Sequence, residues 1–162
     1  MQDALVLISQ ESSNAAEWYS EVAAYVEAGL SETDVEHVGS TSVPGCLTKG
    51  DLDVLVRVRS EAFLGATAAL DGLLARSPRN VPTDDYVEYD YVGRGFSASV
   101  QLVVVDSWHD HRFHGLKALL RSDPCALDRY NGMKREYEGH PMQEYRRAKA
   151  LLIESLLAGA SG

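Results

Sequence analysis

Two aspartates separated by one residue, Asp51 and Asp53, stand at the start of an apolar stretch at positions 51–58 (DLDVLVRV). Side chains two positions apart on a β-strand point to the same face, so both carboxylates would face the same space. Two carboxylates about 7 Å apart repel each other unless a cation lies beside them. Mg²⁺ binds through one or two carboxylates together with substrate phosphate oxygens. The spacing therefore predicts a magnesium site at the start of this strand.

A turn rich in glycine and serine lies upstream, at positions 39–45 (GSTSVPG). Gly39 allows a ligand to approach the backbone closely, and Ser40 with neighbouring N–H groups can donate hydrogen bonds to phosphate oxygens. We include Thr41 and Ser42 in this candidate phosphate-binding loop. The loop and the paired carboxylates are the parts that nucleotidyl transfer needs, because metal ions neutralise the triphosphate and align the attacking oxygen.

Each of these features also has an ordinary structural explanation. An Asp-x-Asp pair is common on exposed strand faces, and a glycine followed by serine occurs in many turns. The ordered combination of a strand, a glycine–serine loop and an Asp-x-Asp strand, preceded by a helix, is more specific than either part.

The segments that must position these residues follow an α+β pattern. Strand patterns occur at positions 5–8, 34–38, 51–58, 86–92 and 97–105. Helical spacing of apolar residues occurs at positions 13–29, 61–75, 109–121, 124–137 and from 140 onwards. We expect a mixed β-sheet of four to five strands flanked by helices, with a helical C-terminal third, in one domain over residues 1–162.

The composition is acidic, with 24 acidic residues against 15 basic ones and a formal net charge of −9. This balance opposes binding to DNA or RNA, but it permits a small polyanion to bind at a local site. No apolar run approaches the ~18 residues that cross a bilayer, and the N-terminus lacks a signal-peptide pattern. Cys46 and Cys125 fit two reduced thiols. We therefore expect a cytoplasmic protein without nucleic-acid or membrane partners.

The run at positions 35–45 (VEHVGSTSVPG), followed by Asp53, resembles the signature of the GrpB family of the nucleotidyltransferase superfamily. The similarity continues C-terminally. Positions 130–135 (YNGMKR) resemble the family's tyrosine-x-x-leucine-lysine-arginine helix, and Tyr145 with Lys149 resembles its final tyrosine-x-x-x-lysine segment. The resemblance spans nearly the whole chain and implies the nucleotidyltransferase fold.

The resemblance also implies roles for the residues that match by position. Gly39 and Ser40 would be the superfamily's phosphate contact, and Asp51 and Asp53 its first two metal carboxylates. Many GrpB members keep only the second carboxylate, so this chain is closer to the active pattern. The third carboxylate lies on a later strand of the superfamily, where this chain offers Gln101. Glutamine can orient a hydroxyl or ligate weakly, but it cannot act as a general base.

Four further residues are candidates for the site, each with a plain alternative. Glu88 and Asp90 share one face of the preceding strand and could replace the missing carboxylate, although exposed hairpin residues are the simpler interpretation. Lys49 belongs to the family motif and could hold a phosphate. Lys134 could do the same if its helix borders the cleft. A solvated lysine is the alternative for both.

The histidines are weaker candidates. His37 ends the strand before the loop, where it could contact a nucleotide or hydrogen-bond the loop. His109, His111 and His114 suggest a metal cluster, but only the last two are neighbours on a helix, and a structural zinc site normally has four ligands.

The sequence therefore predicts a Mg²⁺-dependent nucleotidyltransferase that moves an NMP from an NTP to a hydroxyl of a small molecule or a protein. In this hypothesis Asp51 and Asp53 bind the metal, and Gln101 takes the third position of the catalytic set. The alternative is a nucleotide- or metabolite-binding module without transfer activity, which Gln101 permits. A partner domain is a third and weaker hypothesis.

Overall fold

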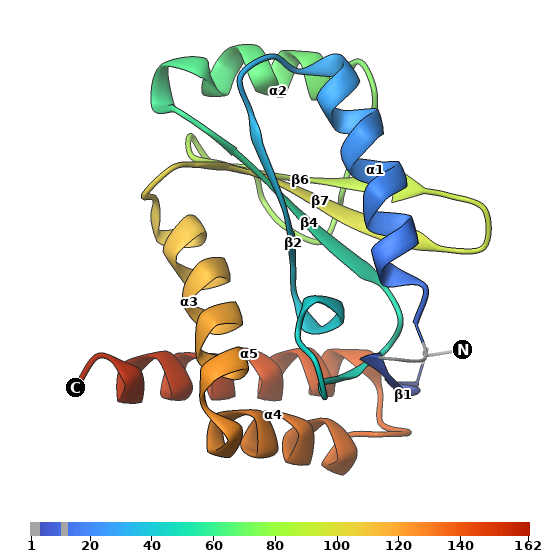
Figure 1. Cartoon of the computed structure of the whole chain (residues 1–162), viewed down its shortest axis with the longest axis vertical. Helices are drawn as coiled ribbons and strands as arrows, with labels where there is room; N and C mark the ends of the chain where they lie inside the picture. Colours follow the sequence, from blue (N-terminus) through green and yellow to red (C-terminus); the bar gives the residue numbers. More distant parts are fainter. Residues whose placement is uncertain (1–3, 11–12) are drawn as a thin grey trace.

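Residues 4–10 and 13–162 are described by a computed structural model, shown in Figure 1. The strands are β1 (Ile8–Ser9), β2 (Asp34–Val38), β3 (Leu47–Thr48), β4 (Leu52–Val58), β5 (Ala75–Arg76), β6 (Tyr86–Val92) and β7 (Ser97–Val104). The helices are α1 (Ala15–Gly29), α2 (Phe63–Asp71), α3 (Trp108–Ser122), α4 (Pro124–Glu136) and α5 (Met142–Ala160). Two short 3₁₀ turns, η2 (Ser40–Ser42) and η3 (Ser60–Ala62), complete the described elements.

The described strands form a mixed five-stranded sheet in the order β2-β4-β7-β6-β5 and a separate pair, β1-β3. Within the large sheet, β4 and β7 run parallel, and the other neighbours are antiparallel. Figure 1 shows α1 and α2 beside the sheet and α3 leading from it to a lower layer of α4 and α5. This arrangement confirms the expected α+β class with a mixed sheet and a helical C-terminal region.

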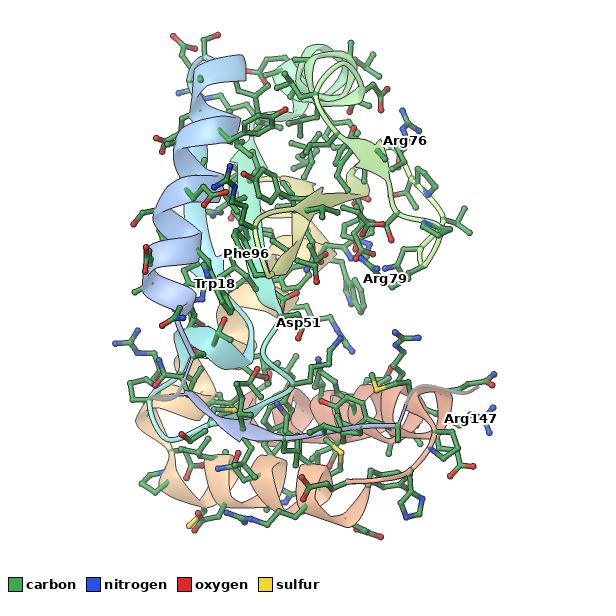
Figure 2. All side chains as sticks on the ribbon, turned by 90° about the vertical axis from the view of Figure 1, so that its right-hand side faces the viewer. Trp18, Asp51, Arg76, Arg79, Phe96 and Arg147 are labelled. Carbon is green, nitrogen blue, oxygen red and sulfur yellow. The ribbon has the colours of Figure 1, made fainter. Side chains whose placement is uncertain are left out.

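The alternation of residues along β4 gives the two sheet faces different roles. Leu52, Val54 and Val56 point to the face covered by α1 and α2, where they join the largest apolar core. At the edge of this core Trp18 of α1 stacks on Phe96 of the β6–β7 turn, with ring centroids 4.8 Å apart (Figure 2). The opposite face carries the polar residues of β4, including Asp53, and it turns towards the helical layer.

The helical layer has its own core and its own caps. Asp123 caps α4 by accepting hydrogen bonds from the N–H groups of Cys125 and Ala126, and Pro124 takes the first helical position. Buried side chains of α3, α4, α5 and the loop after β2 form the second core: Val43, Cys46, Leu120, Ala126, Tyr130, Ile153 and Leu156. The layer therefore packs as a unit against the polar face of the sheet.

Two expected elements differ from the structure. The strand expected at 5–8 is limited to β1, which pairs with β3. Leu5 instead exchanges backbone hydrogen bonds with the α4–α5 connection. The helix expected at 61–75 ends at Asp71, because Gly72 caps it and the chain then forms the edge strand β5. In the described part of the chain no helix has both the length and the apolar character needed to cross a membrane.

Candidate active site

The structure places Asp51 and Asp53 in the lining of a large cavity, about 610 Å³ in volume, between the sheet and α5. Asp53 lies in β4, where it pairs with Val38 of β2 and Ser99 of β7. Figure 2 shows Asp51 and Arg79 on the sheet side of the molecule, facing the α4–α5 layer. The charged lining residues are Lys49, Asp51, Asp53, Arg79, Glu88, Asp90, Lys134, Arg146 and Lys149. Five of these are basic, so the cavity is far less acidic than the chain as a whole.

Gly39 brings the candidate phosphate loop directly against Asp53. Its φ is +74°, in the region that favours glycine. A Cβ atom at this position would lie 2.2 Å from Oδ2 of Asp53. The loop and the carboxylate are thus in contact only because position 39 has no side chain.

Of the loop residues, only Ser40 faces the large cavity. Thr41 is buried, and its Oγ1 lies 2.8 Å from Nε2 of His37. Ser42 donates its hydroxyl to the carbonyl of Gly39 at 2.7 Å. Thr41 and Ser42 therefore hold the shape of the turn through their side chains. His37, stacked on Tyr19, belongs to the same support of the loop.

The electrostatics of the cavity centre on Asp53. Burial, with a smaller contribution from neighbouring Asp51, raises the pKa of Asp53 to about 6. Lys149 and Lys49 act in the opposite direction but do not cancel the effect. Burial disfavours the ionised form of this carboxylate, and a bound divalent cation would favour that form.

The two lysines predicted to hold phosphate have other partners in this structure. Nζ of Lys49 lies 2.7 Å from Oδ2 of Asp51, so the lysine and the first carboxylate form an ion pair. Lys134 is 1% exposed and donates to the Ser40 hydroxyl and to the Leu47 carbonyl. Burial lowers the pKa of Lys134 to about 8. Its ammonium group supports Ser40 from beneath the loop.

Gln101 lies next to Asp53, as its place on β7 predicts. Its Nε2 donates to Oδ1 of Asp53 at 3.4 Å, and its Oε1 accepts from the Tyr86 hydroxyl at 3.2 Å. These two contacts define which end of the amide faces the carboxylate.

Glu88 and Asp90 line the same cavity, but Arg79 holds both of them. Arg79 Nη2 donates to Glu88 Oε1 at 2.8 Å and also to Asp90. Glu88 additionally accepts from Ser99 Oγ at 2.7 Å and from Asn80. Among the described residues no group of three or more histidine, cysteine or acidic side chains could hold a metal ion. The two aspartates are thus not joined by a third carboxylate.

Several residues of this cavity were not predicted from the sequence. Tyr145, Arg146 and Lys149 line its wall from α5, at the spacing of one helix face. Tyr130 contributes most to raising the pKa of Lys149, followed by Tyr145 and the two aspartates, so Lys149 is cationic at neutral pH. The Tyr145–Lys149 spacing was a usable signal, whereas nothing local marks the residues of the β5–β6 loop as site residues.

A sequence model of the GrpB protein family matches residues 6–158. The chain belongs to the GrpB family. A UPF0157 protein of Vibrio cholerae is 30% identical over 135 residues, which cover 83% of this chain and 71% of the relative.

The crystal structure of a GrpB protein from Enterococcus faecalis has the same fold. It matches with a TM-score of 0.72 and 18% identity, over 97% of this chain and 100% of the other. A Cid1 poly(U) polymerase, solved with MgGTP, matches with a TM-score of 0.48 and 12% identity, over 73% of this chain and 38% of that protein.

The GrpB signature corresponds to one compact piece of this structure. Positions 35–45 run from β2 through η2 and place Gly39 on Asp53, and Lys134 of the helical motif supports Ser40 from below. Arg57, by contrast, lies at the far end of β4, where Asp110 of α3 accepts two hydrogen bonds of 2.8 Å from it. The family motifs therefore converge on the end of β4 that carries the aspartates.

These residues fit Mg²⁺ as a partly built site. The ion commonly binds proteins through one or two carboxylates and takes its remaining ligands from water and substrate phosphates. Asp51 and Asp53 would supply the carboxylates, and a bound cation would offset the burial that, with a smaller contribution from Asp51, raises the pKa of Asp53. The site is complete only with a ligand that brings further oxygens, such as a phosphate chain.

Proposed function

We propose that this GrpB protein is a Mg²⁺-dependent nucleotidyltransferase that binds an NTP in the large cavity and transfers the NMP to a hydroxyl. The observation that supports this function best is the contact of the Gly39–Ser40 turn with Asp53, beside Asp51, at the rim of a cavity with basic residues on its opposite wall. A phosphate chain lying between the two walls would meet carboxylates and turn on one side and cations on the other. The expected acceptor is a small molecule or a protein, not a nucleic acid.

In this proposal five residues that line the large cavity have defined roles. Asp51 and Asp53 would hold Mg²⁺, which supplies charge neutralisation of the triphosphate when it is bound. Ser40 and the backbone of its turn donate hydrogen bonds to phosphate oxygens. Lys149 meets the phosphates from α5. Gln101, hydrogen-bonded to Asp53, orients the acceptor hydroxyl but does not take its proton.

A second function, nucleotide binding without transfer, is favoured by a specific observation. The third carboxylate position is occupied by Gln101, and the two nearby carboxylates, Glu88 and Asp90, are bound by Arg79. Apart from Asp51 and Asp53, which would bind the metal, no free carboxylate among the described residues then lies close enough to accept the proton of an attacking hydroxyl.

Calorimetry tests the binding that both functions share. Each NTP is titrated into the wild type with Mg²⁺ and with EDTA, and then into Asp53→Asn and Asp128→Asn. Asp128 is exposed on α4, so its variant loses the same charge outside the cavity. We expect binding that requires Mg²⁺, is lost in Asp53→Asn and is retained in Asp128→Asn. Absence of Mg²⁺-dependent binding in the wild type would refute both functions.

Pyrophosphate release separates the two functions. With a bound NTP and a panel of hydroxyl compounds, transfer releases one pyrophosphate for each NMP moved. Release that depends on the added hydroxyl compound and on Asp53 supports the transferase. Tight Mg²⁺-dependent binding without release across the panel favours the binding module.

A further inference from the structure

A second, smaller cavity of about 130 Å³ lies on the other side of Asp53, under α3. Ser40, Asp53, Gln101 and Lys149 line both this cavity and the large one. Asp53 therefore stands where two spaces meet. The large cavity is lined mainly by polar side chains, whereas the small cavity is lined mainly by apolar ones.

The small cavity is enclosed mainly by apolar side chains. Its walls come from the loop after β2, one face of α3 and the end of α5: Val43, Phe113, Leu116, Leu120 and Ile153. A dry apolar cavity of about 150 Å³ accommodates benzene, so this one suits a body of about one aromatic ring. A nucleoside with its phosphates needs the larger space, which lies within the usual range for ligand sites.

The charged groups of the small cavity are mostly basic. Besides the shared Asp53 and Lys149, it contains Arg112 and Lys117 of α3. Lys117 donates to the His37 carbonyl at 2.6 Å. The Arg112 guanidinium lies 5.0 Å from the centre of the Trp108 ring, and its side chain has no ion pair or hydrogen bond with the described residues. A half-buried guanidinium without a carboxylate partner, at the edge of an apolar pocket, suits a carboxylate on the ligand.

The two cavities meet at Asp53, and the geometry of phosphoryl transfer suggests a different role for each of them. The attacking and leaving oxygens lie roughly in line on opposite sides of phosphorus, so donor and acceptor approach from different sides. We propose that the small cavity is the acceptor subsite, and that the acceptor is a small hydroxyl compound with an apolar body of about one ring and a carboxylate. This inference rests on the proposed transferase function.

In this arrangement the acceptor hydroxyl points out of the small cavity towards Gln101 and Asp53. Its oxygen forms a bond to the α-phosphorus of the NTP, the bond from that phosphorus to the bridging oxygen breaks, and pyrophosphate leaves with that bonding pair. The hydroxyl proton goes to solvent or to the departing pyrophosphate. The carboxylate of the acceptor is held by Arg112 at the edge of the pocket.

Three single-ring probes separate the parts of this proposal: 4-hydroxybenzoate has the hydroxyl and the carboxylate, p-cresol lacks the carboxylate, and p-toluate lacks the hydroxyl. Binding is measured by calorimetry and located by amide chemical shifts on the intact chain. We expect 4-hydroxybenzoate to bind and to shift the amides of Phe113 and Leu116. We expect p-cresol to bind about tenfold more weakly, because the charge-assisted contact with Arg112 is missing.

Two variants and two matched controls test the location. Leu116→Trp fills the cavity, and Leu151→Trp adds the same ring on the exposed side of α5. Arg112→Gln removes the proposed carboxylate contact, and Arg147→Gln removes an exposed arginine that lines neither cavity. We expect Leu116→Trp to abolish binding of 4-hydroxybenzoate and Arg112→Gln to weaken it about tenfold while leaving p-cresol unchanged. Both controls should bind as the wild type does.

Mg²⁺–ATP titrations into the same variants distinguish this inference from the proposed function. Unchanged ATP binding in Leu116→Trp shows that the variant is folded and that its defect is confined to the small cavity. The assignment is overturned if 4-hydroxybenzoate binds Leu116→Trp as tightly as the wild type. It is also overturned if p-cresol and 4-hydroxybenzoate bind equally, or if no probe binds at millimolar concentration. Absence of Mg²⁺-dependent ATP binding in the wild type would refute the transferase and with it the acceptor role, whereas the probe data would still show whether the small cavity binds a one-ring carboxylate.

Discussion

Asp53 is the residue on which the contacts of the site converge. The Gly39 turn lies against its carboxylate, Gln101 donates to it, and its strand partner Ser99 donates to Glu88. An isolated aspartate on an exposed strand would have none of these contacts. Burial and the charge of Asp51 together raise its pKa, so the folded protein holds this carboxylate in an unfavourable ionised state at neutral pH.

The first prediction follows from the sign of that pKa shift. The folded state binds the Asp53 proton more tightly than the unfolded chain does, so the free energy of unfolding falls as the pH rises from 3.8 to about 6. Asp53→Asn removes this loss. In EDTA the variant should therefore be more stable than the wild type by about 3 kcal/mol at pH 7.5, and nearly equal to it at pH 4. Urea unfolding at both pH values measures the difference, and a less stable variant at pH 7.5 would contradict it.

The second prediction concerns the missing side chain at position 39. Gly39→Ala combines an unfavourable positive φ with a Cβ atom 2.2 Å from Asp53, and it should cost about 2 to 4 kcal/mol. Gly95→Ala is the matched control, because Gly95 has a φ of +77° but no atoms near the added Cβ. It should cost only about 1 kcal/mol. Equal losses in chemical unfolding of the two variants would show that the contact with Asp53 has no effect.

At the scale of elements, α3 is joined to β4 by Arg57 and Asp110. The carboxylate accepts two hydrogen bonds of 2.8 Å from the guanidinium and one from the N–H of Asp106. Its side chain is 2% exposed. This pair fixes the start of α3 on the sheet, and α3 in turn forms one wall of the small cavity.

The third prediction compares two of the three carboxylates that lie near Arg57, since Glu36 is also 3.6 Å from its guanidinium. Asp110→Asn removes the bidentate partner of the Arg57 side chain, which is only 18% exposed, and should cost about 3 kcal/mol. Asp34→Asn removes a partner whose side chain is 55% exposed, and should cost less than about 1 kcal/mol. Denaturant midpoints of the two variants provide the measurement. A similar small cost for both would mean that α3 does not depend on this pair.

The sequence predicted those elements whose residues are determined by near neighbours in the chain, and it missed those that depend on a distant strand. The strands 34–38 and 86–92 and the start of α4 were predicted closely, because alternation, Asp123 and Pro124 act through neighbours in the chain. The edge strand β5 has only two residues and exists through its pairing with β6, so no local pattern marked it. β1 likewise depends on β3.

The same distinction holds for the candidate site. Asp51, Asp53 and Gly39 are close in sequence, and their spacing alone placed them together. Arg79 reaches the cavity from the β5–β6 loop, and its hold on Glu88 depends on how β6 and β7 pair. Lys134 was expected to meet phosphate, but only the packing of α4 under the loop shows that it is buried against Ser40. Long-range packing decides these roles.

At the scale of the whole molecule, the large cavity lies between two layers. One wall belongs to the sheet, and the other belongs to α5. The two layers have separate apolar cores, and a third cluster, in which Phe113 of α3 packs against Val38, Leu55, Tyr86 and Val103 of the sheet, joins the sheet to α3. A ligand held by Asp51 and Lys149 would add a connection between the sheet and α5.

The fourth prediction is that Mg²⁺ and ATP together stabilise the whole chain. At a ligand concentration of about 100 times Kd, binding adds about 2.7 kcal/mol to the free energy of unfolding. For a chain of this size the melting temperature should rise by roughly 5 to 11 °C. EDTA should abolish the rise, and Lys149→Met should reduce it. Scanning calorimetry with Mg²⁺ alone is the control, and an equal rise without nucleotide would contradict the prediction.

The parallel pairing of β4 with β7 has a consequence for how the protein folds. Leu52 pairs with Ala98, so positions 52 and 98, 46 apart, must meet before this pair can form. The β6–β7 hairpin closes over a short turn and can form earlier, whereas pairing between distant segments is slow. Because Asp53 and Gln101 are brought together by the late step, ligand binding should develop in the slow phase of refolding. Trp18, which stacks on the hairpin turn, reports the approach of α1 by its fluorescence. In variants that slow the pairing of β4 with β7, ligand binding should recover later during refolding than in the wild type.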